Sequence, residues 1–294
     1  MFDIIIVGAG PAGLTAAIYA RRNDKKVLVF EKSSPGGQII NSPKIENYPG
    51  FKNISGAEFA TKLYNQAQDL GAKFIFDEII KIENFNKKKV LYTKSGKYEA
   101  KKVIIATGCM PKKLELQNEE KLIGKGVSYC ATCDGAFYKD KTVAVYGGGN
   151  TACLDAIFLS NYVKNVFIIC RSTIKAEQNL QNQIKEKNNI RIITNTIVTK
   201  LIGDEELKQI EIKTNDNTKL IDVDGLFVAI GQKPYANNFT NVLDIDKYGY
   251  ALSNENCETK IKGIYVAGDV REKKVRQLTT AVADGTISSV NASI

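Results

Sequence analysis

Residues 2–32 read FDIIIVGAGPAGLTAAIYARRNDKKVLVFEK, which predicts a strand, a glycine-rich turn, a helix and a second strand. The turn carries G-x-G-x-x-G at Gly8, Gly10 and Gly13, and the second strand ends at Glu31. Glycines at these positions permit a tight turn and a close approach to a pyrophosphate, whose charge the helix N-terminus favours. A terminal acid accepts hydrogen bonds from ribose hydroxyls. Because strand, helix and acid accompany the glycines, we predict a dinucleotide site; the alternative is a purely structural turn.

A second copy of this pattern lies at residues 142–172, TVAVYGGGNTACLDAIFLSNYVKNVFIICRS. Gly147, Gly149 and Ala152 occupy its three motif positions. A strand, a glycine-rich turn, a helix and a strand again follow one another in the order that the dinucleotide fingerprint requires. The chain is therefore expected to contain two dinucleotide-type domains.

The two copies differ at the residue that reads the ribose. In each copy this residue lies 23 positions after the first motif glycine, and it is Glu31 in the first copy and Cys170 in the second. A site for NADH requires Asp or Glu here, and a site for NADPH requires basic side chains for the 2′-phosphate. Only Arg171 and, further on, Lys175 supply positive charge. The second copy predicts the fold of a nicotinamide domain with little of its ribose-binding chemistry.

The first domain is expected to be discontinuous. Residues 263–294 predict a strand, a turn at Gly268 and Asp269 and a closing helix. A Gly-Asp turn after a buried strand suits the ribityl and phosphate groups of a cofactor, so we assign it to the first domain. The predicted fold is α/β, with two Rossmann-like, doubly wound, three-layer domains, the second inserted in the first. The predicted boundaries are 1–112 plus 243–294 for the first, cofactor-binding domain and 113–242 for an inserted NAD(P)-type domain.

Composition and charge favour a globular cytoplasmic protein. The N-terminus has no basic signal-peptide region, and the chain has no apolar run of about 18 residues. The formal charge is +9, mostly from dispersed lysines that are not interleaved with aromatic residues, so nucleic-acid binding is not expected. The excess of Lys reflects either genome composition or a surface that steers an acidic macromolecule.

Histidine is absent, which excludes a His general base and a His metal ligand. Of the six cysteines, Cys109, Cys153, Cys170 and Cys257 are scattered through apolar or ordinary contexts, and we expect buried or inert thiols.

The remaining two cysteines lie in SYCATCDGAFY, residues 128–138. A zinc site, a structural disulfide and a redox pair are the three interpretations of Cys130 and Cys133. An isolated C-x-x-C lacks the second ligand pair of a zinc site, and structural disulfides are rare in cytoplasmic chains. Thiols at this spacing lower each other's pKa, which favours the reactive thiolate. We therefore favour a redox pair and no metal. One interpretation of Asp134 is a turn or helix-capping residue before Gly135, which is compatible with a second role for its carboxyl.

Seven motifs occur in order along the chain and together carry a family resemblance. They are GAGPAG near the start, GGQ at 36–38, ENYPG at 46–50, ATG at 106–108, CATCDG at 130–135, GGGNTA at 147–152, and AGDV followed by RQ at 276–277. With them the chain resembles, over its whole length, the low-molecular-weight bacterial thioredoxin reductases.

The resemblance implies FAD in the outer domain. The cofactor contacts that it implies are Gly8, Gly10, Pro11, Ala12, Gly13, Glu31, Lys32, Gly37, Gln38, Asn47, Ala106, Thr107, Gly108, Gly268, Asp269, Arg276 and Gln277.

The resemblance also implies roles for the residues of CATCD. Cys133 is the flavin-side sulfur, Cys130 attacks the disulfide of thioredoxin, and Asp134 protonates a leaving thiolate. The pair takes two electrons from reduced flavin and passes them to thioredoxin. A homodimer is implied as well.

One departure from the family pattern concerns the electron donor. Family members that use NADPH carry His-Arg-Arg and a further Arg where this chain has Cys170, Arg171, Ser172 and, further on, Lys175. Loss of an Arg fork removes bidentate phosphate recognition. We therefore expect an acidic carrier such as ferredoxin, as in the ferredoxin-dependent flavin thioredoxin reductases of anaerobes. NADPH bound at a degenerate site is the alternative. Two rival functions are a ferredoxin–NADP oxidoreductase-like flavoprotein, against which the dithiol counts, and a flavin-binding redox sensor.

Overall fold

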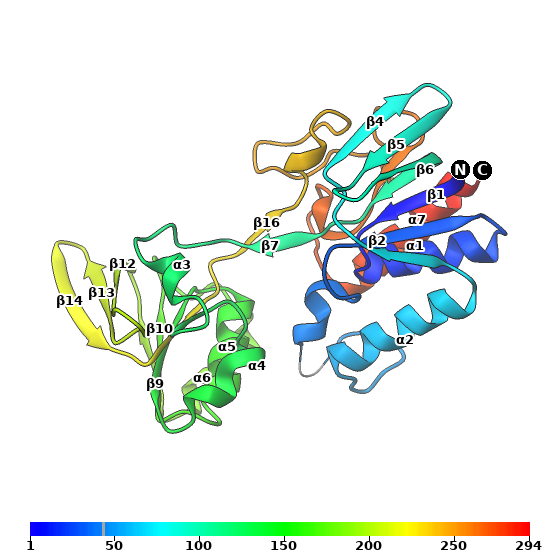
Figure 1. Cartoon of the computed structure of the whole chain (residues 1–294). Helices are drawn as coiled ribbons and strands as arrows, with labels where there is room; N and C mark the ends of the chain where they lie inside the picture. The colour runs from blue at the N-terminus through cyan, green and yellow to red at the C-terminus, as the bar shows by residue number, and fades with distance from the viewer. Residues whose placement is uncertain (43–44) are drawn as a thin grey trace. The chain divides into compact units, whose positions relative to one another are not determined.

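A computed structural model describes residues 1–42 and 45–294, except for the side chain of Cys133. The chain forms two compact units (Figure 1). Unit 1 consists of Met1–Met110 and Lys233–Ile294, and unit 2 consists of Pro111–Gln232. Unit 2 is thus an insertion in unit 1.

The return of the chain to unit 1 differs from the predicted boundary. The sequence placed this boundary at residue 243, whereas the chain re-enters unit 1 at Lys233. The segment between them contains the short helix η3 (Asn237–Phe239), and Phe239 is fully buried in the core of unit 1 together with Val242. Burial of these apolar side chains, which no turn motif announces, fixes the boundary.

Unit 1 is built on a seven-stranded sheet with the order β3-β2-β1-β6-β5-β4, and β17 lies beside β6. The strands β1, β2, β3, β6 and β17 pair in parallel, whereas β5 and β4 extend the sheet in the antiparallel sense. The strands are β1 (Phe2–Val7), β2 (Val27–Glu31), β3 (Lys73–Phe76), β4 (Lys81–Phe85), β5 (Lys88–Tyr92), β6 (Lys97–Ile105) and β17 (Ile264–Val266).

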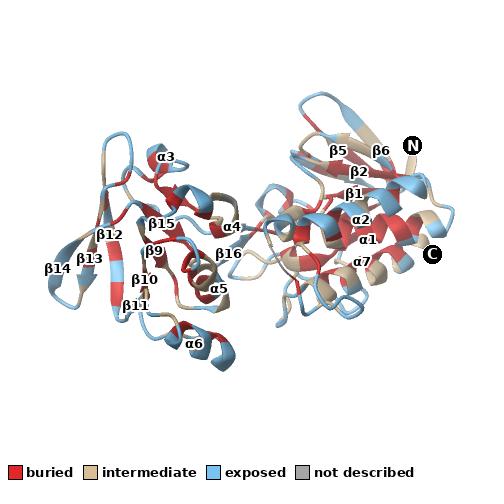
Figure 2. Cartoon of the chain, turned by 90° about the horizontal axis from the view of Figure 1, so that it is seen from below, coloured by how far each residue is buried: buried red, intermediate tan, exposed pale blue. Residues whose placement is uncertain are grey.

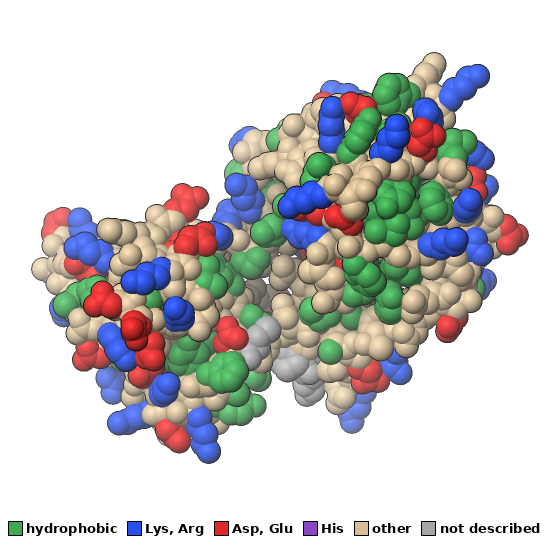
Figure 3. All heavy atoms as spheres, in the orientation of Figure 1, with side chains coloured by type: hydrophobic (Ala, Val, Ile, Leu, Met, Phe, Trp, Pro, Cys, Tyr) green, Lys and Arg blue, Asp and Glu red, His purple; other side chains and the backbone are tan. Residues whose placement is uncertain are grey.

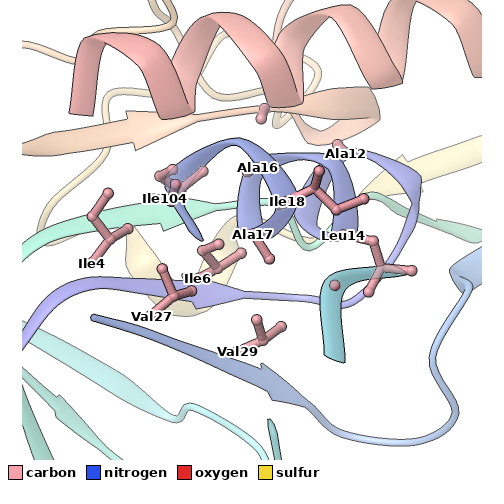
Figure 4. Close-up of a cluster of buried hydrophobic side chains, with 14 of the residues drawn as sticks. Ile4, Ile6, Ala12, Leu14, Ala16, Ala17, Ile18, Val27, Val29 and Ile104 are labelled. Atoms are coloured by element: carbon pink, nitrogen blue, oxygen red, sulfur yellow. The ribbon is translucent and has the colours of Figure 1, made fainter. Parts of the chain in front are cut away.

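Helices pack against the parallel part of this sheet. They are α1 (Pro11–Arg22), α2 (Gly56–Asp69) and α7 (Leu278–Ser293), with short turns η1 (Gly37–Asn41) and η4 (Gly268–Val270). The apolar runs of β1 and β2 are buried, as expected for strands covered on both faces. Figure 4 shows Ile6 and Val29 from these strands in one cluster with Leu14 of α1. The cluster anchors the turn that joins β1 to α1.

Unit 2 has a parallel five-stranded sheet with the order β11-β10-β9-β15-β8. A separate antiparallel sheet, β12-β13-β14, packs with it in one apolar core. The strands are β8 (Val127–Ser128), β9 (Thr142–Tyr146), β10 (Asn165–Ile169), β11 (Ile190–Ile193), β12 (Thr196–Ile202), β13 (Gln209–Thr214), β14 (Asn217–Asp222) and β15 (Gly225–Val228). The helices are α3 (Glu119–Leu122), α4 (Ala131–Asp134), η2 (Gly135–Tyr138), α5 (Asn150–Leu159) and α6 (Gln178–Lys185).

Two short strands carry the chain between the units. They are β7 (Cys109–Pro111) and β16 (Gln232–Pro234), and they pair with each other. In each unit the central strands of the parallel sheet are largely buried, whereas the edge strands β3 and β11 are partly exposed and the connecting loops are mostly exposed (Figure 2).

The surface carries charge of both signs. On the face shown in Figure 3, Lys and Arg side chains are scattered over both units and intermixed with Asp and Glu. Exposed ion pairs such as Lys260–Asp244, at 2.6 Å, and Lys200–Glu211, at 2.9 Å, contribute to this mixture. Within the described part of the chain, none of the helices combines the length and the apolar character that a membrane crossing needs.

Candidate functional site

The glycine-rich turn of unit 1 presents the start of α1 as an anion site. Gly8 has φ +104°, and a Cβ there would lie 2.4 Å from the carbonyl oxygen of Ala106, so glycine is required. Gly10 is the N-cap and Pro11 the first helical residue. In the described residues no side chain caps this helix, so its first N–H groups remain available to a phosphate.

Glu31, at the end of β2, is held by two backbone donors. Its Oε2 accepts a hydrogen bond from Ala9 N–H at 2.8 Å, and its Oε1 accepts one from Ser33 N–H at 2.9 Å. Both contacts fix the carboxylate beside the glycine-rich turn. The prediction that this acid lies next to the dinucleotide turn is thus met by the geometry, and its ribose role stays a prediction.

A pocket opens beside Glu31. The residues that line it are Val7, Gly8, Phe30, Glu31, Lys32, Asp77, Glu78, Ile79, Thr107, Tyr235 and Phe239. Gly8, Glu31, Lys32 and Thr107 were predicted as cofactor residues from the sequence. The rest were missed, although Asp77 and Glu78 directly follow β3, at the carboxyl edge of the parallel sheet where ligands bind.

Tyr235 closes one side of this pocket. Its hydroxyl donates a hydrogen bond to Glu78 Oε1, and the Lys32 ammonium lies 3.8 Å from the ring centroid. Burial, reinforced by the hydrogen bond to Glu78, raises the pKa of Tyr235 to about 12. The phenol therefore stays protonated near neutral pH and keeps its hydrogen bond to Glu78.

The segment that follows β2 brings further predicted residues to the turn. Gly37 approaches Gly10 so closely that a Cβ on Gly37 would lie 3.2 Å from the Cα of Gly10. Gln38 Nε2 donates to the carbonyl of Cys109 at 3.3 Å. Asn47 is close to the start of α7, because its Nδ2 lies 3.2 Å from Oε1 of Gln277.

Two polar atoms near η4 are buried without a hydrogen-bond partner among the described residues. They are Oδ1 of Asp269 and Nε of Arg276. Burial raises the pKa of the Asp269 carboxyl above its usual value. Such atoms are normally satisfied by a partner, so an acceptor and a donor stand ready for a ligand.

These features fit the FAD that the sequence implies. The α1 N-terminus suits the pyrophosphate, Glu31 suits a ribose, and the atoms of Asp269 and Arg276 that have no hydrogen-bond partner among the described residues suit additional hydroxyl and polar ring groups. All predicted cofactor residues lie in unit 1. The ones not yet placed are Ala12 and Gly13 in the first turn of α1, Ala106 and Gly108 directly after β6, and Gly268 in η4.

In unit 2, the cysteine motif begins directly after β8. Cys130 is half-buried, and its sulfur is in the disulfide state, with Oγ1 of Thr132 at 3.4 Å. The side chain of Cys133 lies outside the described residues, so its predicted role is not tested here. Asp134 N–H donates to the carbonyl of Cys130 at 3.2 Å, which closes the turn of α4.

Ser128 connects Asp134 to Cys130 and was missed from the sequence. Its buried hydroxyl donates to Oδ2 of Asp134 at 2.6 Å and accepts a hydrogen bond from Cys130 N–H at 3.0 Å. Asp134 is the N-cap residue of η2, the position that the turn or capping interpretation predicted, but its side chain makes no capping hydrogen bond there. The carboxyl is instead fixed beside the cysteine turn. A serine two residues before the first cysteine was the available signal.

Two neighbours complete this region. Glu119 is buried; it accepts hydrogen bonds from the Tyr129 hydroxyl and from the N–H groups of Leu114 and Glu115, which anchors the residue before Cys130. Phe137 follows the motif and is 75% exposed. An exposed aromatic ring of this size offers a contact for another protein.

The second glycine-rich motif differs chemically from the first. Cys170 is buried, its thiol donates to the carbonyl of Ser172 at 3.2 Å, and burial raises its pKa. Arg171 and Lys175 are exposed. A neutral thiol thus occupies the position at which a nicotinamide site requires a charged side chain to bind the ribose or the 2′-phosphate.

The remaining cysteines are free and buried, as predicted: Cys109, Cys153, Cys170 and Cys257. Burial raises the pKa of Cys109 to about 12, and those of Cys153 and Cys257 to about 11. Reactive thiolates are not expected at these positions.

The fold and these sites are those of a flavoprotein-type disulfide oxidoreductase, and comparison with known proteins agrees. The chain belongs to the pyridine nucleotide-disulphide oxidoreductase family, whose sequence profile matches residues 2–285. A Clostridium pasteurianum protein described as a 34.2 kDa protein in rubredoxin operon is 42% identical over 295 residues, covering 99% of this chain and 96% of that protein. A thioredoxin reductase from Listeria monocytogenes is 37% identical over 296 residues, covering 99% and 93%.

Solved structures extend the comparison. Thioredoxin reductase from Lactococcus lactis matches with a TM-score of 0.96 and 34% identity, covering 99% of this chain and 98% of that one. A ferredoxin-flavin thioredoxin reductase from Clostridium acetobutylicum matches with a TM-score of 0.55 and 30% identity, covering 99% and 96%. The resemblance to thioredoxin reductases and the predicted fold of two Rossmann-like domains are thereby confirmed. By TM-score, the ferredoxin-flavin thioredoxin reductase is a more distant structural match than the Lactococcus lactis enzyme.

Proposed function

We propose that this chain is a FAD-dependent thioredoxin reductase that passes electrons through Cys130 and Cys133 to the disulfide of thioredoxin. The observation that carries the proposal is the Asp134 carboxyl, held by Ser128 beside Cys130, in a chain that is similar over its whole length to thioredoxin reductases. An acid fixed next to a reactive sulfur is what disulfide exchange needs, since a leaving thiolate must gain a proton.

FAD, when bound, supplies a carrier that can accept electrons singly or in pairs and deliver a pair to a disulfide. The N–H groups at the start of α1 would bind its pyrophosphate, Glu31 its ribose, and Asp269 and Arg276 its remaining polar groups. The pocket beside Glu31 would exclude water from the nucleotide end.

The thiol chemistry proposed for unit 2 starts from the pair after it has been reduced by two electrons from FAD. The Cys130 thiolate attacks the thioredoxin disulfide, a mixed disulfide forms, and one thioredoxin sulfur leaves and takes a proton. Asp134 is the proposed donor of that proton. The Cys133 thiol then passes its proton to the Asp134 carboxylate and attacks the mixed disulfide, which closes the Cys130–Cys133 disulfide and releases the second thioredoxin sulfur, which takes that proton. Two electrons pass to thioredoxin.

The proposed electron donor is ferredoxin, which would deliver two electrons in separate steps. Cys170 supplies no carboxylate for the ribose of NADH, and Ser172 stands where a second Arg would complete a fork for the 2′-phosphate of NADPH. The formal charge of +9 suits an acidic carrier.

NADPH is the second candidate donor. Arg171 and Lys175 are exposed next to the second glycine-rich turn and could meet a 2′-phosphate, although without the fork of a paired Arg. A ferredoxin–NADP oxidoreductase-like activity is less well supported, because hydride transfer needs no dithiol. A homodimer and a cytoplasmic location, both expected from the sequence, belong to the same proposal.

Turnover tests the proposed class of enzyme. FAD-loaded protein, oxidised thioredoxin and chemically reduced ferredoxin are mixed without oxygen, and new thioredoxin thiols are counted. We expect many thiols per enzyme molecule. If FAD binds but no thioredoxin thiol appears with ferredoxin, NADPH or NADH as the electron donor, the chain is a redox sensor and the proposal is wrong.

A further inference from the structure

The segment that follows β17 contains a buried ion cluster that no cofactor motif includes. It consists of Asp284 in α7 together with Arg271 and Lys273. The Asp284 side chain is 7% exposed, that of Arg271 14% and that of Lys273 11%. Charges this deeply buried are retained only when they are paired and hydrogen-bonded.

Asp284 accepts three hydrogen bonds. Its Oδ1 accepts one from Nη1 of Arg271 at 2.8 Å, and its Oδ2 accepts from Lys273 Nζ at 2.9 Å and from Gly268 N–H at 3.0 Å. The Gly268 contact places the carboxylate directly under the turn that carries Asp269. Asp284 thus bonds to the backbone of the proposed cofactor turn and to a cation beside it.

Helix packing fixes Asp284 in this place. A Cβ on the adjacent Gly285 would lie 2.3 Å from the carbonyl oxygen of Ala12, so α7 approaches the first turn of α1 as closely as a backbone allows. The cluster therefore lies where the glycine-rich turn, η4 and α7 meet.

Lys273 lies between two carboxylates. Its Nζ is 2.9 Å from Asp284 Oδ2 and 3.7 Å from Asp269 Oδ1, the second distance being too long for a hydrogen bond. Arg271 is held more firmly than Lys273, because its guanidinium also donates hydrogen bonds to Ser253 Oγ and to the carbonyl oxygen of Asn254. The Lys273 ammonium has one further contact, to Oγ1 of Thr280 at a long 3.4 Å, so it is the cation of this cluster that can change carboxylates more easily.

We propose that Asp284 is a positioning residue that holds Lys273 away from Asp269, so that Oδ1 of Asp269 stays available to the cofactor. Without the charge of Asp284, a movement of less than 1 Å brings the ammonium to Asp269, which then pairs with Lys273 instead of with FAD. This inference rests on the proposed binding of FAD in unit 1.

The test is the dissociation constant of FAD for the full-length chain, measured by fluorescence as FAD is titrated into protein freed of its flavin. Asp284→Asn should weaken binding roughly tenfold to a hundredfold, the loss of about one hydrogen bond to a charged group. Asp284→Asn with Lys273→Met should recover most of the affinity, because the competing cation is gone. A merely structural role predicts that the double variant binds no better than the single one.

Two further variants complete the test. Asp244→Asn removes an exposed ion pair of the same unit and should leave the affinity unchanged. Lys273→Arg keeps Asp284 in place but introduces a guanidinium that can bond to both carboxylates, so this variant should bind FAD more weakly than Lys273→Met. This comparison can be made even if Asp284→Asn does not fold. Equal affinities of these two Lys273 variants, or unchanged affinity in folded Asp284→Asn, overturn the inference. Failure of the unmodified chain to bind FAD would instead contradict the proposed function and this inference with it.

Discussion

Cys170 occupies in the second glycine-rich motif the position that Glu31 occupies in the first. The backbone around the two residues is the same. Gly8 N–H donates to the carbonyl of Phe30 at 2.7 Å, and Gly147 N–H donates to that of Ile169 at 2.9 Å.

The loops that follow also match. Gly36 N–H donates to the carbonyl of Ala9 at 2.7 Å, and Lys175 N–H donates to that of Gly148 at 2.7 Å. The two motifs therefore share a backbone and differ in side-chain chemistry: a carboxylate at the end of β2 and a neutral thiol at the end of β10. The first motif thus has the carboxylate that we predict to bind a ribose, and the second has a thiol in its place.

The first prediction concerns Glu31. Glu31→Ala should weaken FAD retention by about 1 to 3 kcal/mol, the range for a lost hydrogen bond to a charged group. Equilibrium dialysis measures the change. Cys170→Ala, at the matching position of the other motif, is the control and should retain FAD like the unmodified protein. Equal retention by both variants would place the cofactor elsewhere.

The second prediction concerns the order of attack by the two cysteines. Cys133→Ser should trap a mixed disulfide between Cys130 and thioredoxin, because the resolving thiol is missing. Cys130→Ser should abolish turnover while FAD remains bound. Non-reducing electrophoresis and peptide mapping identify the adduct.

Cys153→Ala, which removes a free buried thiol, is the control for these variants and should turn over normally. A thioredoxin adduct on Cys133 in the Cys130→Ser variant would reverse the assigned roles.

The third prediction concerns Ser128. Ser128→Ala removes the donor to Oδ2 of Asp134 and should lower kcat about tenfold, as expected for a lost hydrogen bond to a charged group, with KM for thioredoxin unchanged. Steady-state kinetics separate the two constants. Ser160→Ala removes a second buried hydroxyl of unit 2, one bonded to the carbonyl of Ile157, and should leave kcat unchanged. Equal kcat values for both variants would mean that Asp134 needs no anchor.

The fourth prediction concerns Phe137. Truncation of its exposed ring in Phe137→Ala should raise KM for thioredoxin several-fold while kcat stays the same, because contact area and not chemistry is lost. Leu220→Ala removes an equally apolar side chain, 54% exposed on β14, and serves as the control. A lower kcat with an unchanged KM would assign Phe137 to the chemical step.

The fold was predictable where local turn chemistry specifies it. Gly8 and Gly147 mark tight turns whose spacing to the next strand end is the same, so both units could be recognised from the sequence. The return to unit 1 at Lys233 could not, because it depends on burial of Phe239 against strands far away in the chain.

The residues of the candidate site were predictable from the sequence where they belong to a motif with a fixed spacing. Glu31 follows from its place in the motif, whereas Tyr235 and Glu78 share a pocket wall although they are distant in sequence. Ser128 and Asp284 act through hydrogen bonds that no spacing rule describes. Their roles become visible only when the chain is folded.

Reduction of the flavin by each candidate electron donor tests the proposed function most directly. The FAD-loaded protein is mixed without oxygen with NADPH, NADH or reduced ferredoxin, and the flavin absorption band is followed in time. We expect the pyridine nucleotides to leave the flavin oxidised for many minutes, because Cys170 provides no ribose or phosphate contact. Reduced ferredoxin should bleach it, at a rate that falls as salt screens the net positive charge of the chain beyond a Debye length of about 10 Å at 0.1 M. Rapid and stoichiometric reduction of the flavin by NADPH would contradict the ferredoxin assignment.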